Sequence, residues 1–178
     1  WCKQDERIPL MLRGARQIGK IYVVEKCAKK LFKHMVEINF ELEPEYKTCF
    51  ESLKPTDIIN KIYQLTDQKI ISGHTLLFLD EIQLCSRAIM ALRYFYEKMP
   101  ELHVVAAGSL LEFAFGEISI PVGRVQYLYM YPMTFYEYLV ALEKETMAEL
   151  ALAQQNDINE YLQQDILGEL KNYFFVGG

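Results

Sequence analysis

One short stretch constrains this chain more than any other: a glycine loop that carries a lysine and lies between two apolar segments. Gly14, Gly19 and Lys20 fit the spacing G-x-x-x-x-G-K, which is typical of a loop that wraps around phosphate groups. The next position is Ile21, where such loops usually have a Ser or Thr hydroxyl that binds Mg²⁺. The sequence therefore predicts phosphate binding, and it casts doubt on metal-dependent chemistry at the adjacent residue.

The segments on either side of this loop have the pattern of a strand followed by a helix. Residues 8–12 are a short apolar run, as in a buried parallel strand, and residues 21–31 place apolar side chains on one helical face. Backbone N–H groups of the loop and of the helix start can then point at an anion, and Lys20 can reach the β- and γ-phosphates. We expect the nucleotide-binding loop to consist of Gly14, Ala15, Arg16, Gln17, Ile18, Gly19, Lys20 and Ile21.

A second element further along the chain supplies two acids. Thr75 is followed by four apolar residues, 76–79, and then by Asp80 and Glu81, as in a buried strand that delivers carboxylates to its C-terminal end. Ligands of open α/β sheets bind at that edge. We expect Asp80 to hold Mg²⁺, directly or through water, and Glu81 to be the general base that polarises the attacking water. The loop and the acids together predict ATP and Mg²⁺ as the cofactors.

A third apolar segment, residues 103–109, ends in a small polar side chain. In ATPases that insert a strand between the loop strand and the acid strand, such a residue contacts the γ-phosphate or the water. Ser109 is the candidate here, and its alternative role is that of a helix or turn cap. Strands and helices alternate throughout, which predicts a parallel sheet with helices on both faces. Further strands are expected at 35–40 and 125–129, and further helices at 55–65 and 86–99.

Local signals refine this arrangement. Thr56 is the expected cap of the helix that begins near Pro55, and residues 110–121 are expected to form a loop. A capping box between Thr134 and Glu137 is expected to open a helical pattern that continues to residue 175. We interpret the aromatic residues of this region as core packing, with a base-stacking platform as the alternative. They are Tyr127, Tyr129, Tyr131, Phe135, Tyr136 and Tyr138.

Four motifs in order identify a family resemblance: G-A-R-Q-I-G-K, L-L-F-L-D-E-I-Q, V-V-A-A-G-S-L-L-E and P-V-G-R-V-Q-Y-L-Y-M-Y-P-M-T-F-Y-E-Y-L. With them the chain resembles the prokaryotic AAA-type ATPases that carry a poorly characterised C-terminal region after the ATPase domain. The resemblance covers nearly the whole chain. It implies a P-loop NTPase fold of the α/β class, a three-layer sandwich whose mostly parallel five-stranded sheet has the order 5-1-4-3-2.

The resemblance also implies roles for individual residues. Lys20 would contact phosphate, Asp80 would bind Mg²⁺ and Glu81 would be the base, while Ser109 would be the sensor of the γ-phosphate. Arg124 matches the arginine of the P-V-G-R motif, a candidate for contacting nucleotide in the same subunit or in a neighbouring one. A surface or structural ion pair is the alternative for this arginine.

Ile21 departs from the family, whose members usually have Thr at this position. A branched aliphatic side chain cannot bind Mg²⁺, which requires oxygen ligands. We expect nucleotide binding to persist and Mg²⁺-dependent hydrolysis to be weakened, at a cost on the order of 3 kcal/mol in the barrier. The alternative is a regulatory module that binds nucleotide without hydrolysing it. A GTPase is disfavoured because Tyr63 stands where the motif N-K-x-D needs Asp, and no acceptor site for a small-molecule kinase is evident.

Composition limits the partners. The net charge is −5, which argues against nucleic-acid binding by this domain, although residues 1–36 hold nine Lys and Arg against three acids. We interpret that basic segment as the exposed face of one helix. Four scattered cysteines without a C-x-x-C pair disfavour zinc and fit a reduced, cytoplasmic setting, and no membrane-spanning segment is expected.

The organisation expected from these observations is an AAA-type ATPase domain over residues 1–178 with a helical end from about 134 to 178. We expect the chain to be the N-terminal portion of a longer protein. Its expected partners are the nucleotide, a C-terminal region of the same polypeptide, and a second copy of the chain or another protein.

Overall fold

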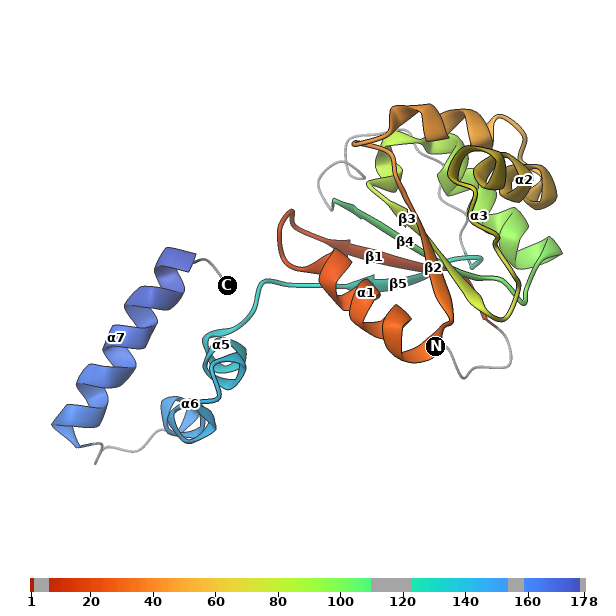
Figure 1. Ribbon diagram of the computed structural model, residues 1–178. Coiled ribbons are helices and arrows are strands. Elements are labelled where there is room, and N and C mark those ends of the chain that lie inside the picture. The colour runs from red at the N-terminus through yellow and green to blue at the C-terminus, as the bar shows by residue number, and fades with distance from the viewer. Residues whose placement is uncertain (2–6, 110–122, 154–158, 177–178) are drawn as a thin grey trace. The chain divides into compact units, whose positions relative to one another are not determined.

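The computed structural model describes residues 1, 7–109, 123–153 and 159–176, so the loop expected at 110–121 lies outside the described residues. The chain divides into two compact units, Trp1–Met130 and Tyr131–Gly178. The first unit holds a β-sheet with helices, and the second holds helices alone (Figure 1). No helix in the described ranges combines the length and the apolar character that crossing a lipid bilayer requires.

The first unit is built on one sheet in which every strand pairing is parallel. Its strand order is β2-β3-β4-β1-β5, which is the predicted order 5-1-4-3-2 counted from the other edge. The fold prediction is therefore confirmed. Because β4 lies between β1 and β3, the carboxyl ends of these three strands are adjacent. The strands are β1 (Leu10–Gly14), β2 (His34–Asn39), β3 (Thr75–Asp80), β4 (His103–Ser109) and β5 (Gln126–Tyr129).

Helices cover both faces of the sheet and complete three layers (Figure 1). Alternate side chains of the fully buried strand β3 separate the two cores. Leu76 and Phe78 pack in the core that contains α1, while Leu77 and Leu79 pack in the core that contains α2 and α3. The helices are α1 (Lys20–Leu31), α2 (Pro55–Thr66) and α3 (Ser86–Lys98), with the 3₁₀ helices η1 (Pro44–Phe50) and η2 (Ile82–Leu84).

Two local predictions about this unit require correction. Helix α2 has Lys54 at its N-cap and no side-chain cap, so the assignment of Thr56 as the cap is wrong. Pro55 occupies the first helical position, where its fixed φ and missing N–H suit a helix start, and this places Thr56 inside the first turn. Strand β1 is displaced toward the loop relative to the expected range 8–12, and Gly14 is its last residue.

The second unit consists of α5 (Phe135–Ala141), α6 (Glu145–Leu152) and α7 (Glu160–Val176). The predicted capping box is present: the Thr134 side chain accepts from the Glu137 N–H, and the Glu137 carboxylate accepts from the Thr134 N–H. The helical pattern expected to continue to residue 175 is divided into separate helices, and Glu143 adopts a positive φ of 59° between α5 and α6. Among the described residues of this unit, only Leu139 and Ala148 are buried.

The aromatic residues near the boundary of the two units separate into two groups. Phe135 and Tyr138 contact Tyr173 of α7, with ring centroids 5.6 and 5.5 Å away. Tyr129 and Tyr131 are exposed, the latter by 76%. The prediction that the whole set packs in the core is wrong for these two residues and for Tyr136, which is also exposed. Tyr129 lies on β5, an edge strand whose side chains have few neighbours, and Tyr131 follows the end of that strand.

Candidate phosphate site

The glycine loop joins β1 to α1 and depends on both of its glycines. A Cβ at Gly14 would lie 2.5 Å from the carbonyl oxygen of Met130 and would also collide with the Ile18 side chain, so only glycine fits there. Gly19 has a φ of 85°, a conformation that glycine adopts without steric cost, and it is the N-cap of α1. Among the described side chains, none caps the start of α1 and none in its first turn is acidic. The first N–H groups of α1 are therefore placed for an anion.

Lys20 is the first residue of α1, and its side chain reaches back into the loop. Its side chain is buried, and its Nζ donates hydrogen bonds to the carbonyl oxygens of Gly14 at 3.1 Å and Ala15 at 2.6 Å. These contacts hold the ammonium group inside the loop, where it can exchange loop carbonyls for phosphate oxygens. The other loop residues have different surroundings: Arg16 forms an exposed ion pair with Glu41 at 3.8 Å, and Ile18 packs beside Gly14.

Asp80 ends β3 and is 2% exposed. Its Oδ2 accepts a hydrogen bond of 3.0 Å from Nδ2 of Asn39, the last residue of β2. The Asn39 amide cannot turn over, because its Oδ1 accepts from the backbone N–H groups of residues 41 and 42 at 3.0 Å each. Burial raises the pKa of the Asp80 carboxyl. A hydrogen bond from the Glu81 backbone opposes this shift, the negative charge of Glu81 adds to it, and the charge of Lys20 opposes it. This is a carboxylate that gains from a nearby cation.

One hollow brings the loop and the acids together. It encloses about 300 Å³, enough for phosphate groups, and is lined by Gln17, Gly19, Lys20, Ile21, Asp80 and Glu81. Glu81 has a φ of 49°, which few residues other than glycine adopt and which is often found at functional sites. Ile21 is 40% exposed beside these groups, so an aliphatic side chain occupies a position where oxygen would be useful.

The structure brings Ser109 to this edge as well but takes Arg124 away from it. Ser109 is buried at the end of β4, in register with Gly14 on β1. Arg124 precedes β5, and since Gln126 pairs with Leu10, it lies beyond the amino end of β1, at the opposite edge of the sheet. Its Nη1 donates to Glu97 at 2.6 Å, so Arg124 forms the ion pair foreseen as its alternative role.

The described residues fit Mg²⁺ only as an ion that also binds the phosphates of the nucleotide. Within the described parts of the chain, no three His, Cys, Asp or Glu side chains are grouped so that they could hold a metal ion by themselves. Mg²⁺ often binds through one or two carboxylates together with substrate phosphates and water. Asp80 could supply that carboxylate, whereas Ile21 offers no ligand.

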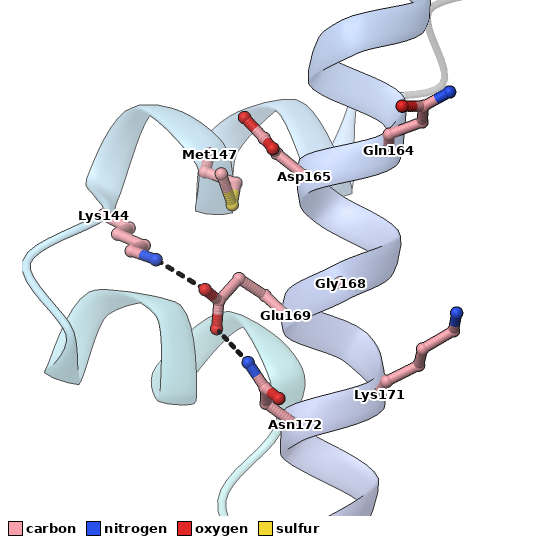
Figure 2. Close-up of a pocket in the computed structure, with 8 residues that line it drawn as sticks. All are labelled: Lys144, Met147, Gln164, Asp165, Gly168, Glu169, Lys171 and Asn172. Carbon is pink, nitrogen blue, oxygen red and sulfur yellow. Dashed lines mark hydrogen bonds and ion pairs between the residues drawn. The ribbon is translucent and has the colours of Figure 1, made fainter.

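A second hollow, in the helical unit, is not a phosphate site. It encloses about 550 Å³ between α6 and α7 (Figure 2). Lys144 points to Glu169 of α7, and its Nζ lies 2.6 Å from the carboxylate, whose pKa this hydrogen bond lowers. Asn172 donates to the same carboxylate at 3.4 Å, while Lys171 points away (Figure 2). Of the two lysines that line the hollow, Lys144 is already neutralised by its partner Glu169.

Sequence reasoning missed Asn39, although a signal was available. The expected strand 35–40 ends near this residue, and strands that are parallel neighbours end at the same edge. The pairing of Asn39 with Asp80 across β2 and β3 could only be known once the two strands were shown to be adjacent.

The comparisons with known proteins agree with this geometry. The sequence profile of a family described as an AAA domain matches residues 6–139. A chain in the structure of Drosophila ORC bound to DNA is similar over 94% of this chain, with a TM-score of 0.52 and 12% identity. At that identity the similarity concerns the fold alone. This chain spans about half of that one, 51% of its length. No curated protein matches the sequence.

Proposed function

The chain belongs to the family of AAA domains, and from that premise we propose that it binds ATP with Mg²⁺ at the hollow beneath its glycine loop and hydrolyses it slowly. One observation carries the proposal: Lys20 and Asp80 line the same 300 Å³ hollow at the carboxyl edge of a parallel sheet. This edge is where ligands bind in open α/β folds.

Each residue of the hollow has a part in the proposed reaction. Lys20 exchanges the carbonyls of Gly14 and Ala15 for phosphate oxygens, and the N–H groups that begin α1 bind the same anion. Asp80 holds Mg²⁺, which supplies charge stabilisation when bound. Glu81 accepts the proton of the attacking water, and Ser109 contacts the γ-phosphate from the neighbouring strand.

Slow turnover follows from Ile21. The usual hydroxyl would add an oxygen ligand for Mg²⁺, and water would have to take its place here. The loss of one charge-stabilising group costs about 3 kcal/mol, or roughly a hundredfold in rate. Affinity depends mainly on Lys20 and the loop backbone, so we expect it to persist.

Ile21 also supports a second candidate function. If water cannot replace the hydroxyl, the domain is a nucleotide-binding regulatory module without turnover. In both cases its further partners are a C-terminal region of the same polypeptide and a second copy of the chain or another protein.

Nucleotide affinity and Mg²⁺-dependent phosphate release separate these functions. We expect the unmodified chain to bind ATP, and Ile21→Thr to release phosphate about a hundredfold faster at similar affinity. Glu81→Gln in the Ile21→Thr background should retain ATP and lose release. Ile71→Thr, the same exchange at an isoleucine that is 45% exposed on the surface, is the matched control.

The other outcomes are equally informative. Equal release by the unmodified chain and by Ile21→Thr would show that Ile21 does not limit turnover. Binding without release in either form would favour the regulatory module. If neither form binds ATP with or without Mg²⁺, the proposed function is wrong.

A further inference from the structure

The corner that follows β3 holds a polar side chain to which the proposed reaction gives no role. The chain leaves Asp80, passes through the left-handed residue Glu81 and enters η2, where the Leu84 N–H donates to the Glu81 carbonyl at 3.0 Å. Ile82 is completely buried and anchors the corner in the core. The backbone from Glu81 to Leu84 is thus held at both ends, and the side chains that it carries have little freedom.

Within this corner the Gln83 side chain folds back onto Glu81. Its Nε2 donates a hydrogen bond to Glu81 Oε2. The direction is fixed by chemistry, because an ionised carboxylate only accepts and so must face the N–H₂ end of the amide. The Gln83 Oε1 is buried and has no hydrogen-bond partner among the described residues. A buried acceptor without a partner costs free energy. The Gln83 side chain therefore keeps its contact with Glu81 although its own oxygen is left without a partner.

The lining of the phosphate-site hollow shows how the contact between Gln83 and Glu81 can affect the reaction. Glu81 lines the hollow and Gln83 does not, so Gln83 lies outside the reacting space and can act only through Glu81. A glutamate has three side-chain torsions, and a general base must hold one oxygen within hydrogen-bond distance of the water. A donor on Oε2 removes that freedom and leaves Oε1 for the water.

We propose that Gln83 is the positioning residue of the general base: it binds Glu81 Oε2 and thereby directs Oε1 toward the attacking water. In the step that it supports, Oε1 takes a proton from water, the water oxygen bonds to the γ-phosphorus, and the bond to the bridging oxygen breaks. The electron pair of that bond stays on the departing ADP. The inference rests on the proposed function, since it assumes that Glu81 is the base.

The test uses the complete chain in the Ile21→Thr background, where turnover is expected to be measurable. Gln83→Met removes the donor and keeps the length of the side chain, while Gln83→Glu keeps its shape and replaces the donor with an acceptor. Each should lower kcat for phosphate release about tenfold to a hundredfold, the usual effect of a misplaced catalytic group, and leave the Kd for ATP within about twofold. Gln64→Met, at an exposed glutamine of α2, is the matched control.

A second measurement does not depend on turnover. The side-chain carboxyl carbon of Glu81 can be observed by NMR and assigned through its loss in Glu81→Gln. It should give one resonance, displaced from those of exposed glutamates, in the parent protein, and it should move toward the exposed position in Gln83→Met. If the Gln83 side chain did not bind Glu81 in solution, this resonance would stay in place in Gln83→Met.

The outcomes separate the inference from the function on which it rests. Unchanged release with an unchanged Glu81 resonance in both Gln83 variants would overturn the positioning role while ATP binding stands. If the parent binds ATP without hydrolysing it, the resonance alone decides. If the parent binds no ATP, the proposed function fails, and a Glu81 resonance that still depends on Gln83 would identify a purely structural contact.

Discussion

The two halves of the phosphate site differ in how firmly the fold supports them. In the acid half, Asp80 is held by Asn39 and Glu81 by Gln83, so each carboxylate has a side-chain donor. In the loop half, the hydrogen bonds of Lys20 to described residues go to the backbone carbonyls of Gly14 and Ala15, and the Ile21 side chain contributes no polar group. The half that would drive the chemistry has its carboxylates held by side-chain donors, whereas the half that would bind the phosphates lacks the usual metal ligand.

This difference separates nucleotide affinity from turnover, which occur together in a site that has all of its ligands. The loop backbone and Lys20 depend on no metal, so they account for affinity. The acids require a metal and a placed water, so they account for turnover. A chain with a supported acid half and an incomplete loop half should bind nucleotide far better than it converts it.

The largest expected effect on nucleotide affinity tests whether the loop half supplies that affinity. Lys20→Ala removes the charge-assisted hydrogen bonds to phosphate, and we expect ATP to bind about thirtyfold more weakly, equivalent to about 2 kcal/mol. Isothermal titration at fixed salt measures this loss. Lys26→Ala, at an exposed position of the same helix, is the control and should change affinity by less than about twofold. Equal losses in the two variants would mean that the loop is not the phosphate site.

The sequence was sufficient for those parts of the site that lie on regular elements. Lys20 follows from its motif, and the meeting of Asp80 with the loop follows from parallel strands that end at one edge. Ser109 was expected at the same edge, because a strand between the other two was expected, and β4 is that strand. For Lys20 and Asp80 the motif, periodicity and the rule for ligand binding in open sheets are enough. The position of the strand that carries Ser109 was instead implied by the family resemblance.

The sequence was insufficient wherever a side chain acts through a tertiary contact. Asn39 required knowledge that β2 lies beside β3, and Gln83 required the left-handed corner at Glu81. The ion pair of Arg124 was named only as an alternative, because it depends on how α3 approaches the amino end of β5. The exposed Tyr129 was wrongly expected in the core, since composition does not reveal that β5 is an edge strand.

A medium effect, on stability, is expected for Asp80→Asn. This variant tests whether the acid half of the site is built to hold a cation. Burial raises the pKa of the Asp80 carboxyl, so the folded state binds this proton more tightly than the unfolded state does. The charged form therefore lowers stability as the pH rises above the ordinary value of a carboxyl group. Without nucleotide, Asp80→Asn should raise the free energy of unfolding at neutral pH by about 0.5–2 kcal/mol, measured by urea unfolding.

The pH dependence and the ligand distinguish this effect from general stabilisation. The gain should disappear when the pH falls below the ordinary carboxyl value, where both proteins are neutral at this position. It should also reverse with ATP and Mg²⁺, because only the unmodified Asp80 gains from the cation. Asp165→Asn, on the exposed surface of α7, is the control and should show neither behaviour. A gain that is constant with pH would show that desolvation of Asp80 is not its cause.

The smallest effect on ATP affinity is expected for Arg124→Ala. This variant tests whether the amino edge of the sheet takes part in the nucleotide site of the same subunit. Because Arg124 lies at the opposite edge from Lys20, its removal should leave the Kd for ATP unchanged within about twofold. Arg93→Ala is a matched control, since both arginines bind Oε1 of Glu97, at 2.6 Å for Arg124 and 2.9 Å for Arg93.

If a neighbouring copy uses Arg124, phosphate release in the Ile21→Thr background should rise with protein concentration, and Arg124→Ala alone should remove that rise. A tenfold loss of ATP affinity at a concentration where the chain is monomeric would contradict this separation of the two edges and would place Arg124 in the site of its own subunit.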